Sequence, residues 1–225
     1  MKIDLKKITF REKTTDENIF KNVFHLNEYN LSQLEDDDVV VDIGSHIGSF
    51  SLKAYEMGSR KIFAFEANYD NSIICAKNCL EYDIRVFNNA VRGNYNLKKV
   101  GSRAGKNLDS ENMNMGGLAI SIGDSIDVIS LEDILNMVGG KIKILKLDCE
   151  GSEYPIIFES EDQVFENIEI IIGEFHPGSL PINKCEKYEN SPKNLEKRLQ
   201  YLNYYTNFIS GSVEDYGHFY CKKIK

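Results

Sequence analysis

The chain has 225 residues, of which 42% are hydrophobic and 28% are charged; this ordinary globular composition excludes a disordered tail, a collagen-like fibre and a small disulfide scaffold. Its 27 basic and 35 acidic side chains give a net charge of −8, which disfavours nucleic acid as a partner because phosphate backbones are bound by basic surfaces. No apolar run reaches the roughly 18 residues of a membrane span, and the charged N-terminus has no secretory signal, so we expect one cytoplasmic domain over residues 1–225.

Helical and strand patterns alternate along the chain. The first is a helical pattern over residues 16–31, with Asp16 as the expected N-cap, inside an N-terminal helical extension of residues 1–37. Short apolar runs then predict strands over 39–44, 61–66, 84–88, 142–148 and 168–174. Segments with a period of 3.6 residues predict helices over 47–57, 70–81, 130–138, 153–160 and 192–202. This alternation predicts an α/β fold with a doubly wound, mostly parallel sheet.

Two regions depart from the alternation. Residues 92–125 are rich in Gly, Asn and Ser and are interpreted as an inserted loop and strand segment, with short strands near 97–101 and 118–122. Near the C-terminus, residues 204–209 and 216–222 are strand-like and predict an antiparallel hairpin at the edge of the sheet. Because no second domain is predicted, we expect substrate specificity to come from loops, chiefly residues 92–125 and residues 177–192.

The most informative local pattern is the run from Asp42 to Gly48, DIGSHIG, where the first predicted strand turns into a helix. Gly44 permits a tight turn and close approach of a ligand, and Gly48 permits close packing of helix on strand. A dinucleotide loop would read GxGxxG and meet a pyrophosphate, which the Asp42 carboxylate would repel. The pattern therefore favours S-adenosylmethionine, which carries a sulfonium and an ammonium group, over a nicotinamide dinucleotide. A turn chosen only for packing is the alternative.

Polar residues also end the next two predicted strands. Glu66 ends the second strand, 22 residues after Gly44, where an acidic residue can bind ribose hydroxyls. Asn88 and Asn89 end the third strand and offer side-chain amides where an adenine edge would lie. Since ligands of open α/β sheets bind outside the carboxyl ends of the strands, these residues and the glycine loop are expected to form one site.

Four acidic or imidazole residues end the last two predicted parallel strands and indicate the reacting end of the site. Asp148 and Glu150 end one strand, and Glu174 and His176 end its neighbour. Such a group can deprotonate a hydroxyl, with Asp148 or His176 as the base. It can alternatively hold a divalent cation through carboxylate oxygens and an imidazole. Glu153 follows at the start of a predicted helix and is explained by the helix dipole.

The chain contains five segments of a known pattern: VVVDIGSHIGSFSL (39–52), FAFEAN (63–68), NNAV (88–91), LKLDCEGSEY (145–154) and GEFHPG (173–178). Together they resemble the FkbM-family S-adenosylmethionine-dependent methyltransferases over about residues 38–180. The resemblance implies a class I Rossmann-like fold and O-methylation of a hydroxyl on a small molecule, sugar or glycan. The chain departs from the family pattern at Ser45 and His46, where the family has AN, and at Ala67, where it has proline.

The resemblance also implies roles for individual residues. The methionine side of the cofactor would lie against the loop that contains Asp42, Gly44, Ser45, His46 and Gly48. Glu66 would hold the ribose, Asn89 would approach the adenine, and Asp148 would lie near the methyl group. The acceptor side would be lined by Glu150, Glu174 and His176.

Three alternatives stay open from the sequence. They are a divalent-metal-assisted form of the same reaction, a nicotinamide oxidoreductase, and a non-catalytic protein that uses a cofactor fold to bind a partner. The oxidoreductase is disfavoured because GxGxxG is missing. The binding protein would have lost its catalytic groups, whereas Asp148 and His176 are present. The pattern names neither the methyl acceptor nor the oligomeric state.

Overall fold

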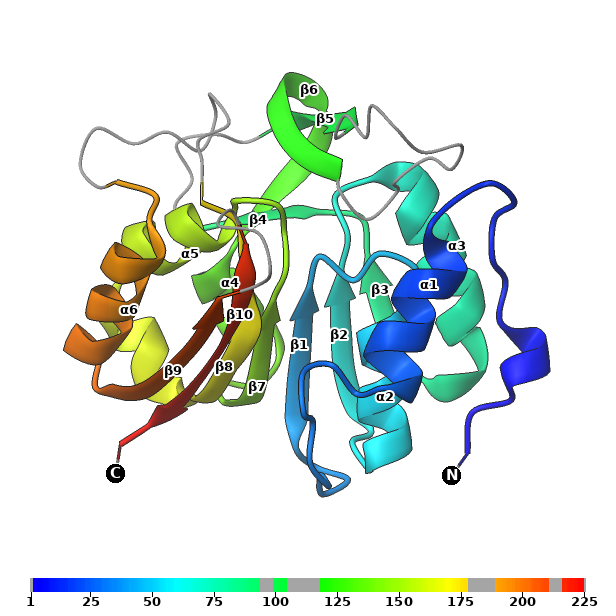
Figure 1. The fold of residues 1–225 in the computed structure, drawn as a ribbon, viewed down its shortest axis with the longest axis horizontal. Coiled ribbons are helices and arrows are strands. Elements are labelled where there is room, and N and C mark those ends of the chain that lie inside the picture. The colour runs from blue at the N-terminus through cyan, green and yellow to red at the C-terminus, as the bar shows by residue number, and fades with distance from the viewer. Residues whose placement is uncertain (1, 94–98, 105–117, 178–188, 211–215, 225) are drawn as a thin grey trace.

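The computed structural model describes residues 2–93, 99–104, 118–177, 189–210 and 216–224. Seven strands build its main sheet: β1 (Val39–Ile43), β2 (Lys61–Phe65), β3 (Arg85–Phe87), β7 (Ile142–Leu147), β8 (Ile168–Phe175), β9 (Tyr204–Ser210) and β10 (Gly217–Lys223). They lie in the order β3-β2-β1-β7-β8-β10-β9 (Figure 1). The first five of this order run parallel, and β10 is antiparallel to β8 and β9. The predicted α/β fold, including the C-terminal antiparallel hairpin, is confirmed.

Helices cover both faces of the sheet. The described residues contain α1 (Asp16–Phe20), α2 (Ser49–Met57), α3 (Tyr69–Cys79), α4 (Leu131–Met137), α5 (Glu153–Glu159) and α6 (Pro192–Tyr201). Shorter turns are η1 (Leu5–Lys7), η2 (Lys21–His25), η3 (Leu80–Tyr82) and η4 (Asp162–Asn167). All six α-helices overlap segments predicted to be helical, and α3 begins one residue before its predicted segment. No helix in the described part of the chain has the length and apolar character to cross a bilayer.

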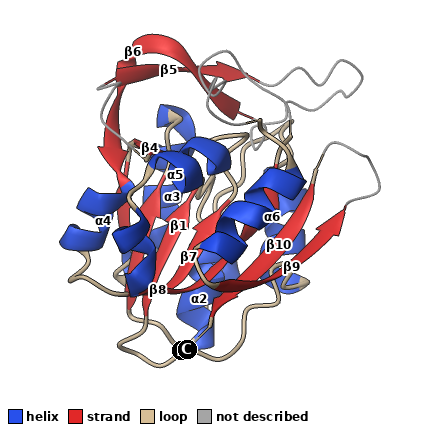
Figure 2. Ribbon diagram, turned by 90° about the vertical axis from the view of Figure 1, so that its left-hand side faces the viewer, coloured by secondary structure: helices blue, strands red, loops and turns tan. Residues whose placement is uncertain are grey.

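The central strands are apolar on both faces because each face is covered. Successive residues of β1 point to opposite sides of the sheet, and Val40 and Val41 are both fully buried. Val41 belongs to a core shared with α4, α5 and α6. Val40 belongs to a core shared with α2, α3 and the N-terminal residues. The molecule therefore has three layers, with the sheet between two sets of helices (Figure 2).

A second, three-stranded sheet is formed by β4 (Ala90–Arg92), β5 (Lys99–Ala104) and β6 (Leu118–Ser130) in the order β4-β6-β5. Figure 1 shows β5 and β6 above the ends of the main strands. The strands predicted near 97–101 and 118–122 correspond to β5 and to the start of β6, but β6 is longer than predicted. β4 was not predicted; it pairs in parallel with the end of β6, and a segment this short has no periodicity to detect.

The predicted helix over residues 16–31 is wrong in its second half. Helical structure ends at His25, because Asn27 and Asn30 adopt left-handed backbone angles, with φ of 53° and 50°. The Asn27 side chain also accepts a hydrogen bond from the Leu31 N–H and donates one to the Leu31 carbonyl, both at 3.0 Å. Asp16 is not the N-cap; Thr15 holds that position, and Asp16 makes the contacts described below.

Candidate active site

A cleft of about 550 Å³ lies at the carboxyl ends of the parallel strands, the place where open α/β sheets bind ligands. Its walls include eight of the predicted site residues: Gly44, His46, Glu66, Asn89, Asp148, Glu150, Glu174 and His176. Its walls also include N-terminal residues that were not predicted to be there: Ile19, Asn22, Val23, Glu28 and Tyr29. The volume is within the range of small-molecule sites.

The glycine loop is shaped by two close approaches. Gly44 has a φ of 77°, and a Cβ at this position would lie 1.8 Å from the carbonyl oxygen of Asp148, so no other residue fits. Gly48 has a φ of 92° and packs where a Cβ would lie 2.8 Å from the Cys79 sulfur. The N–H groups of Gly44 and Ser45 donate to the Phe65 carbonyl at 2.9 and 3.1 Å. The loop is thereby fixed between β1, β2 and the end of β7.

Glu66 supports the same loop from the end of β2. Its carboxyl oxygens accept the N–H groups of His46 and Asn68, each at 2.8 Å. Burial raises the pKa of Glu66, although these hydrogen bonds oppose the shift. Asn89 lies on the cleft wall, and its side-chain amide donates to the Asp127 carbonyl at 3.2 Å. Glu66 and Asn89 thus both line the cleft, together with residues of the glycine loop.

Three predicted cofactor residues do not line the cleft. Asp42 is fully buried beneath the loop, where it accepts a 2.7 Å hydrogen bond from Ser51 and pairs with the Lys146 amine at 3.1 Å. Ser45 is also buried and lies 3.5 Å from the Cys75 sulfur. Asp42, Ser45 and Gly48 therefore support the loop conformation through buried contacts and do not line the cleft. The Asp42 charge therefore faces Lys146 and is not presented to a ligand.

Lys146 links the two ends of the site and was not predicted as a site residue. Its amine donates to the Gly44 carbonyl at 2.7 Å and lies 3.1 Å from Asp42 and 3.6 Å from Asp148. Burial would lower the pKa of Lys146, but the two carboxylates outweigh burial and raise it. A lysine inside an apolar strand was the signal in the sequence, because buried charges require partners.

The N-terminal segment holds the glycine loop through a charged network. Arg11 donates to both oxygens of Asp16, at 2.9 and 2.8 Å, and to Asn71 at 2.8 Å. Asp16 Oδ1 lies 3.2 Å from His46 Nε2. Burial raises the pKa of Asp16, but the hydrogen bonds from His46 and Arg11 outweigh it and hold the pKa well below its ordinary value.

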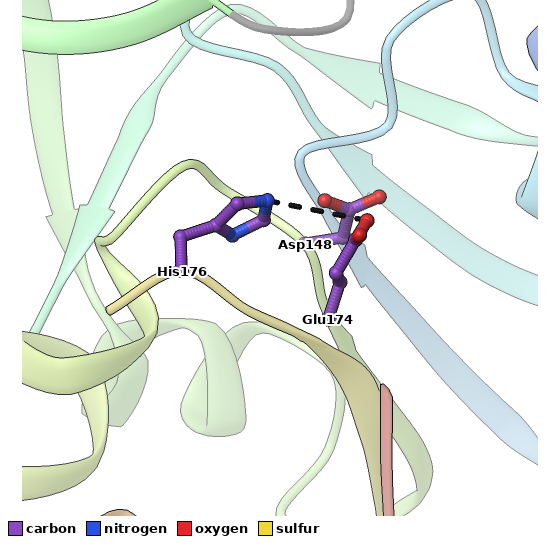
Figure 3. A group of neighbouring side chains, drawn as sticks. All are labelled: Asp148, Glu174 and His176. Atoms are coloured by element: carbon purple, nitrogen blue, oxygen red, sulfur yellow. Dashed lines mark ion pairs between the residues drawn. The ribbon is translucent and has the colours of Figure 1, made fainter. Parts of the chain in front are cut away.

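Asp148, Glu174 and His176, which the sequence placed at neighbouring strand ends, lie close together at the cleft. One ligand atom from each lies within 4.8 Å of the others, and Figure 3 shows the imidazole directed at the two carboxyl groups. His176 Nε2 lies 4.0 Å from Glu174 and 3.9 Å from Glu150. Burial and the neighbouring Asp148 raise the pKa of Glu174 to about 7. Burial and Asp148 also raise the pKa of Glu150, although His176 partly opposes this shift.

Glu153 holds the imidazole from behind, a contact that the helix-dipole interpretation did not predict. This fully buried side chain accepts the His176 Nδ1–H at 3.1 Å and the Cys149 N–H at 2.7 Å. Burial would lower the pKa of His176, but Glu153 and the other carboxyl groups outweigh burial and raise it to about 10. The hydrogen bond to Nδ1 leaves Nε2 directed at the cleft.

Residues from both flanks of the chain complete the reacting end. The Tyr29 hydroxyl donates to Asp148 Oδ2 at 2.7 Å. The His218 ring on β10 packs edge-on against Tyr29, and its Nε2 lies 3.4 Å from Glu28. Burial and the Asp148 charge raise the pKa of Tyr29 well above its ordinary value, so its hydroxyl stays a donor. No pattern in the sequence indicated Tyr29, since it lies in the segment predicted to be helical.

The profile of the Methyltransferase FkbM domain matches residues 42–207 of the chain. The chain belongs to the FkbM methyltransferase family. The match includes the glycine loop, Asp148 and His176, whereas Tyr29 and His218 lie outside it. A search of curated proteins finds no match to the chain.

Solved structures of methyltransferases are among those similar to this FkbM-family protein. The precorrin-6y C5,15-methyltransferase of Geobacter metallireducens GS-15 aligns with a TM-score of 0.50 at 14% identity, covering 98% of this chain and 95% of that one. TrmK of M. capricolum, solved with S-adenosyl-homocysteine, aligns with a TM-score of 0.49 at 16% identity, covering 90% of this chain and 69% of that one. At these identities the first comparison supports the class I methyltransferase fold alone.

Proposed function

We propose that this FkbM-family protein transfers a methyl group from S-adenosylmethionine to a hydroxyl of a small molecule, sugar or glycan. The observation that carries the proposal is the group of Asp148, Glu174 and His176 at the reacting end of the cleft. A carboxyl group can accept the proton that a hydroxyl loses on methylation, and a protonated imidazole can stabilise the negative charge that develops on the oxygen. Family membership supports methyl transfer, and the group supports oxygen as the acceptor atom.

The cleft suits S-adenosylmethionine in size and in charge. Its volume is about 550 Å³, and its lining includes Gly44 and His46 of the glycine loop, Glu66 and Asn89. Glu66 would hold the ribose hydroxyls, and the backbone at Gly44 would approach the methionine part. When bound, the cofactor supplies an electrophilic methyl group on a positively charged sulfur. The acidic cleft wall favours this cation.

At the acceptor end, the residues divide the work between positioning and proton transfer. Burial would raise the pKa of Asp148, but Lys146 and His176 outweigh it and lower the pKa, so Asp148 stays ionised and accepts a hydrogen bond from the acceptor hydroxyl. Glu174, with a pKa near 7, is suited to take the proton near neutral pH. His176 carries a positive charge at that pH and stabilises the developing negative charge on oxygen.

The charge of the cleft also restricts the acceptor. The described residues of its wall include five carboxyl groups, those of Glu28, Glu66, Asp148, Glu150 and Glu174, and neither lysine nor arginine. Such a wall repels phosphate and carboxylate groups. This supports a neutral or cationic acceptor and argues against nucleic acid. The loops of 92–125 and 177–192, predicted to set specificity, lie largely outside the described residues.

Two measurements test the proposal. Calorimetry with S-adenosylhomocysteine should detect binding; no binding at millimolar ligand would contradict it. Transfer of a radiolabelled methyl group should then be measured on a panel of sugars and polyols, with phosphorylated or carboxylated analogues as matched acceptors.

Asp148→Ala and His176→Ala should each lower turnover by about 100-fold or more and leave the Kd of S-adenosylhomocysteine within about threefold. Unchanged turnover in both variants would overturn the assigned acceptor side.

A metal-assisted form of the same reaction is the second candidate, favoured by the same group of three residues. Two carboxylate oxygens and an imidazole nitrogen within 4.8 Å of one another are suited to a divalent cation such as Mg²⁺ or Mn²⁺. Bound there, the cation would supply Lewis-acid activation of the acceptor hydroxyl. EDTA should then abolish turnover and leave S-adenosylhomocysteine binding intact, with recovery on adding Mn²⁺. Full activity in EDTA would exclude this form.

A further inference from the structure

Residues 27–31 form a loop that is built to hold one conformation. The Asn27 side chain bonds both backbone groups of Leu31, each at 3.0 Å, and the Asn30 N–H donates to the Asn27 carbonyl at 2.7 Å. Between these anchors the loop presents Glu28 and Tyr29 to the cleft. A loop closed by three local hydrogen bonds loses little entropy when it positions a side chain.

The Tyr29 ring is fixed by neighbours on two other elements. It packs edge-on against Phe50 of α2, with ring centres 5.5 Å apart, and against His218 of β10, with ring centres 5.6 Å apart. Only 8% of Tyr29 is exposed. The rings of Phe50 and His218 therefore fix the direction from which the Tyr29 hydroxyl donates its hydrogen bond to Asp148.

The contacts of the Asp148 carboxyl group are one-sided. Tyr29 donates to Oδ2 at 2.7 Å, and the Lys146 amine lies 3.6 Å from the same oxygen. Among the described residues, none donates a hydrogen bond to Oδ1 or forms an ion pair with it. One oxygen is thus tied to the protein, and the other is left for a ligand in the cleft.

We propose that Tyr29 is a positioning residue, which orients Asp148 so that Oδ1 receives the acceptor hydroxyl. This inference rests on the proposed function, because it assigns Tyr29 to the acceptor side of that site. Tyr29 lies outside the segment that matches the family, residues 42–207, so family membership does not assign it. The N-terminal loop of residues 27–31 is therefore part of the acceptor site.

The test is Tyr29→Phe, which keeps the ring contacts and removes only the hydroxyl. We expect kcat to fall by about 10- to 100-fold, since misaligned reacting groups are costly, while the Kd of S-adenosylhomocysteine and the KM of the acceptor change by less than about threefold. The matched control is Tyr82→Phe. Tyr82 is also buried, and its hydroxyl accepts the Asp4 N–H at 2.9 Å, away from the cleft; this variant should keep wild-type kcat.

A double-variant cycle separates positioning from general stabilisation. If Tyr29 acts through Asp148, Tyr29→Phe should cause no further loss of kcat in an Asp148→Asn background. Losses that multiply, or an unchanged kcat in Tyr29→Phe, would overturn the inference. If the wild-type protein binds S-adenosylhomocysteine but methylates no acceptor, the proposed function fails first. In that case the role of Tyr29 is tested by a crystal structure of Tyr29→Phe. A rotated Asp148 carboxyl group supports the inference, and an unmoved one overturns it.

Discussion

At the scale of single residues, the charge on His176 depends on a side chain that a ligand cannot reach. Glu153 is fully buried and bonds His176 Nδ1 at 3.1 Å. A histidine paired in this way keeps its ring orientation, and the pairing decides which nitrogen is free. The pKa of about 10 follows from this pairing and from Glu150 and Asp148 nearby.

Glu153→Gln should lower the pKa of His176 from about 10 by about one unit or more, because the amide keeps the shape of the side chain but loses its charge. The pKa can be measured by NMR titration of the imidazole. Glu132→Gln is the control, since Glu132 also lies in the first turn of a helix, α4, but is exposed. An unchanged His176 pKa in Glu153→Gln would show that Glu153 does not set it.

At the scale of elements, Lys146 joins β7 to β1 and to the glycine loop. Its amine contacts Asp42 on β1, the Gly44 carbonyl and Asp148. The three contacts fix the position of the glycine loop relative to Asp148 at the end of β7. Removing one partner of a buried ion pair leaves an uncompensated charge, which costs far more than the pair contributes.

Lys146→Met should therefore lower the free energy of unfolding by about 3–5 kcal/mol, measured by urea denaturation. The double variant Asp42→Asn, Lys146→Met should recover at least about 1 kcal/mol of this loss, because it leaves no unpaired charge beneath the loop. Additive losses in the double variant would contradict the pairing.

The sequence predicted the elements whose pattern repeats and the residues at their ends. Glu66, Asp148 and Glu174 end parallel strands, and parallel strands place their carboxyl ends together. Tyr29 could not be predicted, because the apolar spacing through Leu31 continues the helical pattern, and only the Asn27 contacts end the helix. Likewise, the sequence does not show that Lys146 lies under Asp42, since the pairing depends on strand order.

At the scale of the whole molecule, buried charged side chains attach the N-terminal segment to the glycine loop. Asp16 is fully buried, and its pKa is held below the ordinary value of 3.8 by its contacts with His46 and Arg11, against the effect of burial. A depressed pKa of this kind contributes stability that is present above the ordinary value and is lost as the pH falls through the folded-state pKa.

Asp16→Asn should lower the free energy of unfolding by about 3 kcal/mol at pH 7, because Arg11 and His46 lose a buried partner. The difference from wild type should shrink as the pH falls below about 4, when the unfolded chain binds the proton first. Urea unfolding at several pH values measures both effects. Asp70→Asn is the control, since Asp70 is an exposed residue in the first turn of α3. A difference that does not change with pH would contradict the assignment.

The meeting of Tyr29 with His218 has a consequence for how the protein is made. The cofactor side of the cleft, from Gly44 to Asn89, is translated early, whereas His218 on β10 is translated late. At about 5–20 residues per second, roughly 10 s separate them. During that interval the Tyr29 ring lacks one of its two neighbours. Until β10 has been synthesised, the Tyr29 ring cannot be held in the direction that the proposed role requires, so the alignment of Asp148 should be among the last steps in the folding of the domain.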